Sequence, residues 1–202
     1  MRLEFPGTGA PSIPDDRGLA SAIGNANHRL LLLLALEATR GSPHPVLELG
    51  MGSGSTPQLH DYCAAEGRLL ISCDLDADFA RSFAHLESPL HAIRCGAWNR
   101  VPIDRPWSVA LVDHAPPERR RVEVARLRHF AAILVLHDTE ERSPRYGYDK
   151  IWHLFHYRVD LRVDGSDPDA QADASAVSNS IDVTAWVGAR FPGYPHALSR
   201  GW

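Results

Sequence analysis

The sequence predicts an α/β protein built on a doubly wound, mostly parallel β-sheet. Short apolar runs alternate with stretches suited to helices between residues 46 and 136. These runs are apolar throughout rather than at every second position, which is typical of strands that helices cover on both faces. A glycine-rich turn follows the first run, and acidic residues stand at the ends of later runs, where open α/β sheets bind their ligands.

The order of the elements follows from these runs and from the signals that end them. Parallel strands are expected at residues 46–49, 69–73, 91–95, 107–112 and 131–136. Helices are expected at residues 27–39, 56–65, 78–86 and 117–129, the first of them ending at Gly41. These helices would cover both faces of the sheet.

The pattern changes after Asp138. A further helix is expected at residues 149–156, and alternation of apolar and polar residues predicts half-exposed strands at 157–163 and 181–187. The polar segment 164–180 between them is predicted to be a long loop. The two late strands would form an antiparallel hairpin at one edge of a seven-stranded sheet.

Length and composition fit a single domain over residues 1–202, with an irregular arm at 1–24 and a tail at 190–202. The chain is 44% hydrophobic, which suits one sizeable core. Its net charge of -4 supplies no cationic field for a phosphate backbone, so nucleic acid is not expected as a partner. Tyr194 and Trp202 in the tail could pack over the edge of the sheet or contact a second subunit, so a homo-oligomer is an open alternative.

The composition indicates neither a membrane nor an oxidising compartment. The longest apolar run, residues 30–36, is far shorter than the roughly 20 residues that span a bilayer. The N-terminal residues lack the basic-then-apolar order of a secretory signal. Cys63, Cys73 and Cys95 have no paired spacing that would indicate disulfides or a zinc site. We therefore expect a cytoplasmic protein.

The strongest local signal is the turn Glu48-Leu-Gly50-Met-Gly52-Ser-Gly54, which lies between a strand and a helix. Glycines in such a turn can adopt positive φ and let a ligand lie against the backbone. A dinucleotide-binding turn has its third glycine one position later, where this chain has Ser55, and this disfavours NAD. The carboxylate of Glu48 needs partners inside a buried strand, either a ligand with a cationic amino acid end or backbone N–H groups of nearby loops.

Asp74 ends the second strand, at a distance from the glycine turn where an acidic group binds ribose hydroxyls. Asp76 and Asp78 follow at a predicted helix N-terminus, where aspartates cap free N–H groups. We assign Asp74 to the ribose and Asp78 to capping, and Asp76 suits either role.

At these residues the chain resembles the class I S-adenosylmethionine-dependent methyltransferases, which have a Rossmann-like fold. The likeness covers residues 47 to about 139. The resemblance implies that Glu48 and the turn glycines Gly50, Gly52 and Gly54 surround the methionine part of S-adenosylmethionine. It also implies that Asp74 holds the ribose of this cofactor.

The resemblance further implies that the segment after the third strand lines the adenine. Many relatives have an acidic residue where this chain has Ala97. The adenine would therefore contact Ala97, Trp98, Asn99 or the backbone.

Histidines and aspartates also end the fourth and fifth strands, as Asp113-His114 and His137-Asp138-Thr139. Adjacent strand ends would bring these side chains together at the carboxyl edge of the sheet. Carboxylates of Asp113 and Asp138 could share a hard divalent cation such as Mg²⁺. Either histidine could accept a proton near neutral pH or make a structural hydrogen bond.

This region is similar to the catechol O-methyltransferase branch of the family, whose strand ends carry Asp-His and then Asp-Asn. The resemblance implies Mg²⁺ ligands at Asp113 and Asp138, with the metal holding both oxygens of a vicinal diol. It also implies a cofactor contact at Asp113. Thr139 replaces the amide ligand of the family and Pro116 replaces its lysine base. The catalytic candidates are therefore Asp113, His114 and His137.

The predicted helix at residues 117–129 carries a cluster of arginines. Glu118 and Glu123 are interleaved with this cluster, so we interpret it as a solvated helix face. Its members are Arg119, Arg120, Arg121, Arg126 and Arg128.

The leading hypothesis is an enzyme that transfers the methyl group of S-adenosylmethionine to an oxygen of a small-molecule acceptor. A second hypothesis is a non-catalytic protein that binds S-adenosylmethionine or a related nucleoside. A nicotinamide-dependent oxidoreductase is a third, which the missing third glycine disfavours. A His-Asp phosphohydrolase fits least, because His137-Asp138 follows an apolar strand and such metal sites draw on helices.

Overall fold

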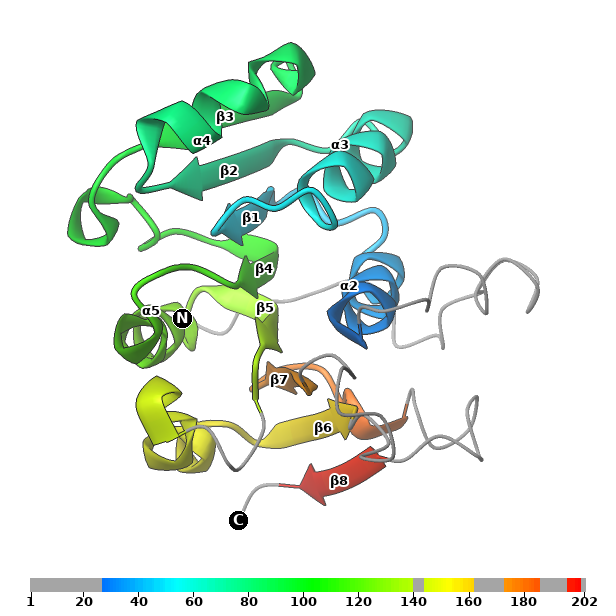
Figure 1. Cartoon of the computed structure of the whole chain (residues 1–202). Coiled ribbons are helices and arrows are strands. Elements are labelled where there is room, and N and C mark those ends of the chain that lie inside the picture. Colours follow the sequence, from blue (N-terminus) through cyan, green and yellow to red (C-terminus); the bar gives the residue numbers. More distant parts are fainter. Residues whose placement is uncertain (1–26, 140–143, 162–172, 186–195, 201–202) are drawn as a thin grey trace.

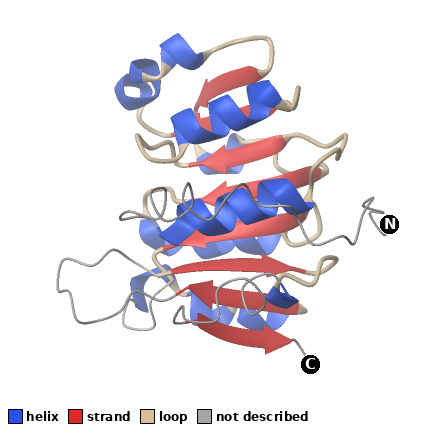
Figure 2. Cartoon of the chain, turned by 90° about the vertical axis from the view of Figure 1, so that its right-hand side faces the viewer, coloured by secondary structure: helices blue, strands red, loops and turns tan. Residues whose placement is uncertain are grey.

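The computed structural model describes residues 27–139, 144–161, 173–185 and 196–200. Its centre is one eight-stranded sheet with the order β3-β2-β1-β4-β5-β7-β6-β8. The first five strands in the chain pair in parallel, whereas β7, β6 and β8 pair antiparallel. Figure 2 shows these strands side by side in one twisted sheet.

The parallel strands confirm the predicted α/β fold closely. They are β1 (Val46–Leu49), β2 (Leu70–Asp74), β3 (His91–Cys95), β4 (Trp107–Val112) and β5 (Ala131–His137). Every residue of β1 and β4 is buried. This explains why these runs are apolar throughout, since helices or turns cover both of their faces.

The α-helices of the described residues also lie near their predicted positions. They are α2 (Asn27–Ala38), α3 (Thr56–Ala65), α4 (Ala77–Ser82) and α5 (Arg120–Leu127). Short 3-10 turns extend α4 and precede α5, at η1 (Ala84–Leu86) and η3 (Pro117–Arg119). Figure 1 shows α2 and α3 on one side of the sheet and α5 on the other.

Each face of the sheet has its own hydrophobic core. On one face the leucines of α2 pack with Val46, Val109 and Leu111. On the other face Val124 and Leu127 of α5 pack with alternate residues of the same strands. The alternation of side chains along β1 and β4 therefore divides the core between two helical layers.

The strands after β5 differ from the prediction. The hairpin itself is confirmed, with β6 (Tyr157–Leu161) antiparallel to its neighbour. However, that neighbour is β7 (Ala174–Ser178), which lies inside the predicted loop, and the strand expected at 181–187 is wrong. The small residues of β7 are buried between β5 and β6, and Ser178 donates a hydrogen bond to the carbonyl of Ala132.

Residues 181–185 do not form a strand because Asp182 starts a turn. Its carboxylate accepts a hydrogen bond from the backbone N–H of Thr184, at 3.1 Å. Ile181 and Val183 pack against the core from this turn, which explains their alternation in the sequence. Residues 186–187 of the predicted strand lie outside the described residues.

Two further predictions change in the C-terminal part. The helix expected at 149–156 is instead a pair of 3-10 turns, η5 (Tyr148–Lys150) and η6 (Trp152–Leu154), preceded by η4 (Pro144–Tyr146). The predicted tail contains β8 (His196–Arg200), which pairs with β6 and makes the eighth strand. The predicted arm at 1–24 and the aromatic residues Tyr194 and Trp202 lie outside the described residues.

None of the helices in the described ranges is long and apolar enough to cross a bilayer. The apolar run at residues 30–36 instead forms the middle of α2, where most of its leucines are buried against the sheet.

The crossover between β3 and β4 differs from the other parallel connections. Within residues 46–137, all of which are described, the other connections contain α3, α4 and α5, but this one contains only the 3-10 turn η2 (Trp98–Arg100). This connection therefore adds no α-helix to the sheet, whereas α3 and α4 both contact β2 and β3.

Candidate functional site

The glycine turn leaves β1 in a conformation that requires glycine at one position. Gly50 has φ +91°, and a Cβ atom there would lie 2.3 Å from the carbonyl oxygen of Asp113. Its N–H donates to the carbonyl of Cys73 at 2.9 Å, while the N–H of Asp113 donates to the carbonyl of Leu49. The turn is therefore pressed against the ends of both β2 and β4.

Glu48 is fully buried beneath this turn. Its carboxylate accepts hydrogen bonds from the hydroxyls of Ser55, at 2.6 Å, and Thr56, at 3.0 Å. The same Thr56 hydroxyl accepts the N–H of Gly52 at 2.9 Å. Its partners within the described residues are thus hydroxyls at the start of α3 rather than backbone N–H groups, and Glu48 holds the shape of the turn.

Burial raises the pKa of Glu48 to about 7, although hydrogen bonds from Ser55, Ser72 and Thr56 act in the opposite direction. Removing a carboxylate from water disfavours its charged form. Glu48 is therefore close to half-ionised at neutral pH in the protein without ligand.

Asp74 ties the second strand to the turn. Its carboxylate accepts the N–H of Met51 at 3.0 Å and the N–H of Asp76 at 2.9 Å. Asp76 caps α4 by accepting the N–H groups of Asp78 and Phe79, so capping belongs to Asp76 rather than to Asp78. Asp74 is half-buried, and carboxylate oxygens that accept one N–H each retain lone pairs for a ligand.

A cleft of about 320 Å³ lies beside the β3–β4 crossover. This volume is in the range of about 300–1,000 Å³ that small-molecule sites have. Its walls include Leu47, Ile71, Cys73 and Cys95 from the sheet and Gly96 and Ala97 from the crossover. Of the adenine candidates, Ala97 therefore lines a cavity.

Trp98 does not line this cleft. It is buried, its indole N–H donates to the carbonyl of Ala115 at 2.6 Å, and its ring lies 4.2 Å from that of His114. Its role is to pack the crossover against the end of β4.

A second group of side chains gathers at the ends of β4 and β5. Asp113, His137 and Asp138 each offer a ligand atom, and these atoms lie within 4.8 Å of one another. Asp138 has a left-handed backbone conformation, with φ 56°. Aspartate tolerates this region better than most residues, and such conformations are concentrated at functional sites.

Arg120, at the start of α5, lies between the two aspartates. Its guanidinium is 2.9 Å from Asp113 Oδ1 and 2.8 Å from Asp138 Oδ2, and its side chain is only 9% exposed. The interpretation of the arginine cluster as a solvated face is therefore wrong for Arg120. The buried guanidinium is stabilised because two carboxylates surround it.

These residues do not fit a Mg²⁺ ion as they stand. Asp113 Oδ1 already binds Arg120 and His137, and Asp138 Oδ2 binds Arg120 and the hydroxyl of Tyr146. A divalent cation there would also have to share both carboxylates with the guanidinium, whose positive charge repels it. The positive charge expected between the aspartates is supplied by the protein.

His137 is oriented by Asp113. Its Nδ1 lies 3.1 Å from Asp113 Oδ1, and because a carboxylate only accepts, Nδ1 carries the proton. Burial lowers the pKa of His137, but the hydrogen bond and the charge of Asp113 raise it more, so that its pKa lies above the usual value. Its Nε2 is buried and has no hydrogen-bond partner in the described part of the chain.

His28, at the start of α2, is a member of this group that the sequence did not indicate. Its ring meets that of His137 edge to face, with 4.5 Å between ring centres. Burial, and then the neighbouring His137, lower its pKa to about 4, so His28 is neutral at neutral pH. It therefore covers His137 without adding charge.

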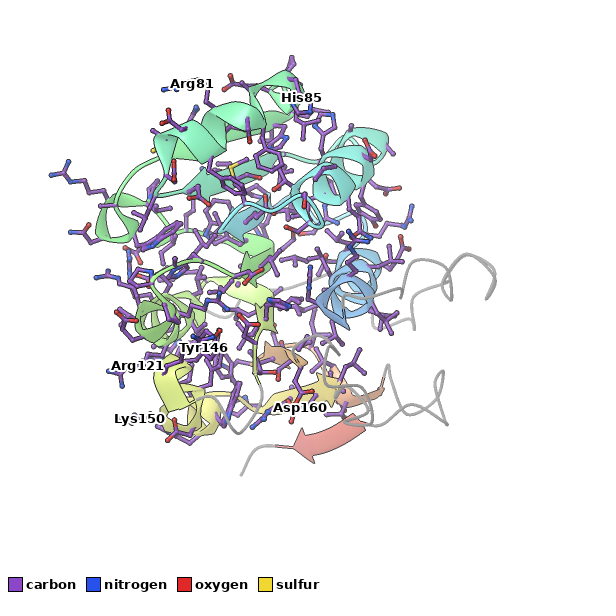
Figure 3. The ribbon with its side chains drawn as sticks, in the orientation of Figure 1. Arg81, His85, Arg121, Tyr146, Lys150 and Asp160 are labelled. Atoms are coloured by element: carbon purple, nitrogen blue, oxygen red, sulfur yellow. The ribbon has the colours of Figure 1, made fainter. Side chains whose placement is uncertain are left out.

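Tyr146 and Tyr148 complete the surroundings of Arg120. Tyr146 donates to Asp138 at 2.8 Å and lies under the guanidinium, while the hydroxyl of Tyr148 donates to the carbonyl of His137. Figure 3 shows Tyr146 beside α5. A histidine at a helix start and tyrosines in a turn carry no local signal, so sequence patterns did not find them.

His114 and Thr139, by contrast, face away from this group. His114 has no exposed side-chain surface, and its Nε2 lies 3.5 Å from Glu123 of α5. Thr139 accepts the hydroxyl of Ser175 in β7. His114 is thus packed against α5, and of the two histidines only His137 belongs to the group at the strand ends.

Replacing Gly50 with alanine is expected to destabilise the protein by about 3 kcal/mol or more, because the methyl group meets the Asp113 backbone as well as requiring positive φ. Gly41 is the matched control, with φ +77° and no atom within 4 Å of the place where a Cβ would lie. Gly41→Ala should cost only the conformational strain of about 1 kcal/mol. Urea unfolding of both variants measures the difference, and equal losses would contradict the close approach.

Replacing Glu48 with glutamine is expected to change how stability depends on pH. A folded pKa of about 7 against an ordinary 4.5 means that stability falls as pH rises through this interval. Over that range the wild type should lose about 3 kcal/mol relative to Glu48→Gln. Urea unfolding at pH 4.5 and pH 8 measures it, and parallel profiles for the two proteins would rule out the buried ionisation.

Comparisons with known proteins agree with this architecture. No protein-family model and no curated protein sequence matches the chain. Among solved structures, an O-methyltransferase from Bacillus cereus in complex with SAH (S-adenosylhomocysteine) superposes with a TM-score of 0.52 at 14% identity, covering 82% of this chain and 92% of that chain. A Klebsiella pneumoniae protein assigned as an O-methyltransferase gives 0.54 at 14% identity, with 83% and 92% covered.

A spermidine synthase from Thermotoga maritima has the same architecture, with a TM-score of 0.51, 14% identity and coverage of 80% of this chain and 62% of that chain. Proteins named for different reactions thus share this fold, and the site must decide the chemistry. Together with the strand order and the antiparallel hairpin, these matches show that the chain has the Rossmann-like fold of the class I methyltransferases.

Proposed function

We propose that this protein transfers the methyl group of S-adenosylmethionine to an oxygen atom of a small-molecule acceptor, with His137 as the general base. The observation that carries the proposal is the hydrogen bond from His137 Nδ1 to Asp113, which leaves a buried Nε2 free of partners in the described chain. A histidine held in one tautomer by a carboxylate is suited to accept a proton through its other nitrogen.

The glycine turn and its neighbours support the cofactor part of the proposal. Asp74 offers carboxylate lone pairs for ribose hydroxyls, and the cleft lined by Ala97 offers an apolar site for the adenine. When bound, S-adenosylmethionine supplies an electrophilic methyl group on a sulfonium cation. A nearby cation favours the charged form of Glu48 and so lowers its raised pKa.

The acid-base step needs few side chains. The acceptor hydroxyl gives its proton to Nε2 of His137, its oxygen forms the new bond to the methyl carbon, and the carbon–sulfur bond breaks with its electron pair left on sulfur. Asp113 stabilises the imidazolium that results, because the two groups are 3.1 Å apart. The remaining requirement is to hold the two substrates in line, which is a matter of positioning.

The proposal predicts that His137→Gln lowers turnover by about 10²- to 10⁴-fold, the usual contribution of a general base. Affinity for S-adenosylmethionine should stay unchanged. The measurement is transfer of a radiolabelled methyl group to a panel of phenols and hydroxy acids. His85→Gln is the control, because His85 is exposed on the far side of the molecule from Tyr146 (Figure 3).

The dependence of turnover on pH is a second measurement of the role of His137. Because the pKa of His137 is raised and only its neutral form accepts a proton, wild-type turnover should increase with pH through and above the ordinary histidine range. If His137→Gln turned over as fast as the wild type, His137 would not be the general base. Cofactor binding without turnover on any acceptor would favour the non-catalytic alternative.

The cofactor part predicts that Asp74→Asn weakens binding of S-adenosylhomocysteine by about 1–3 kcal/mol, because a charge-assisted hydrogen bond to the ribose is lost. Asp78→Asn is the matched control, an exposed aspartate a few residues away whose loss should not change affinity. Calorimetric titration measures both. Equal affinity of the Asp74 variant and the wild type would remove Asp74 from the ribose site.

A further inference from the structure

We propose that Arg120 is a built-in cation that takes the place of a divalent metal at this site, so that the protein binds no metal between Asp113 and Asp138. The reaction of the acceptor at this site rests on the proposed function, whereas the exclusion of a metal stands on geometry alone. The two aspartates end adjacent parallel strands, and the guanidinium bridges them at 2.9 Å and 2.8 Å.

Each of the three nitrogens of the Arg120 guanidinium binds a group of the protein, and these contacts fix the position of the side chain. Its Nε–H donates to the carbonyl of His114 at 2.7 Å, and Nη1 donates to Asp138 and to the carbonyl of His137. Nη2 binds Asp113 at 2.9 Å. A guanidinium has five N–H donors, so the protein itself uses this group almost completely.

The aromatic ring below Arg120 makes the arrangement harder to displace. The centre of the Tyr146 ring is 4.8 Å from the guanidinium carbon, and the hydroxyl of the same ring donates to Asp138. Arginine stacks on aromatic faces and can direct separate N–H groups at two carboxylates, as Arg120 does here, in a way that lysine does not. Moving Arg120 aside for a metal would break both kinds of contact.

The consequence concerns the class of acceptor. A metal between the two aspartates could hold two adjacent oxygens of a diol, but a guanidinium whose N–H groups are almost all used within the protein cannot. The acceptor therefore needs one hydroxyl that reaches Nε2 of His137, and adjacent hydroxyls give it no advantage. The carboxylates serve to orient His137 and to hold Arg120.

The test is titration of the whole protein with MnCl₂, followed by electron paramagnetic resonance, which needs neither cofactor nor acceptor. We expect the wild type to bind no Mn²⁺ at the site at concentrations up to about 1 mM, a range in which weak carboxylate sites fill. Arg120→Met keeps an apolar stem over Tyr146 but removes the charge. It should bind Mn²⁺ at least tenfold more tightly than the wild type.

Two further variants show whether a bound Mn²⁺ ion lies between the aspartates. Adding Asp138→Asn to Arg120→Met should abolish the gained Mn²⁺ binding, which places the ion between the aspartates. If Arg120→Met does not fold, the wild type and Asp138→Asn are compared directly. Binding of Mn²⁺ by the wild type below about 1 mM that Asp138→Asn removes would overturn the proposal, and equal absence of binding in both would support it.

The metal test and the proposed function can fail separately. Methyl transfer that persists in excess chelator supports both the proposed function and the role of Arg120 as the built-in cation. Methyl transfer that stops in chelator and returns with Mg²⁺ overturns only the role of Arg120. A protein that binds neither Mn²⁺ nor S-adenosylmethionine would retain Arg120 as the built-in cation and lose the proposed function.

Discussion

The contact between the backbones of Gly50 and Asp113 joins the two halves of the candidate site. A Cβ atom at Gly50 would lie 2.3 Å from the Asp113 carbonyl oxygen, so only glycine allows the turn to rest on the end of β4. The first half is the turn with Glu48 beneath it, and the second is the group around His137. Because the contact is backbone to backbone, the spacing of the two halves does not depend on flexible side chains.

Charge organises the two halves in different ways. Beneath the turn, Glu48 is buried among hydroxyls without a cation hydrogen-bonded to it, so burial keeps its pKa near neutrality and its charge responds to what binds nearby. At the strand ends, Arg120 forms ion pairs with two aspartates, so its positive charge offsets theirs. One half can thus adjust to a cationic ligand, while the other holds its own cation beside His137.

The parallel part of the fold could be predicted from the sequence because burial on both faces makes its strands apolar throughout. β7 could not, because Ala174 to Ser178 are small and partly polar and resemble a loop. Their hydroxyls donate to tertiary partners, Asp160 and the carbonyl of Ala132, which a local pattern does not contain. The alternation of Ile181 and Val183 was misleading as well, because both residues pack against the core from a turn rather than from a strand.

The candidate site shows a similar division between local and tertiary information. Strand ends are marked in the sequence, so the gathering of Asp113, His137 and Asp138 could be predicted. Whether that group holds a metal could not, because the deciding charge comes from Arg120 on the next helix, one of several arginines in a row that the sequence does not distinguish. A carboxylate pair at a sheet edge specifies only that a cation is needed. The fold around it determines whether that cation is an ion from solution or a side chain of the protein, and here it is the buried guanidinium.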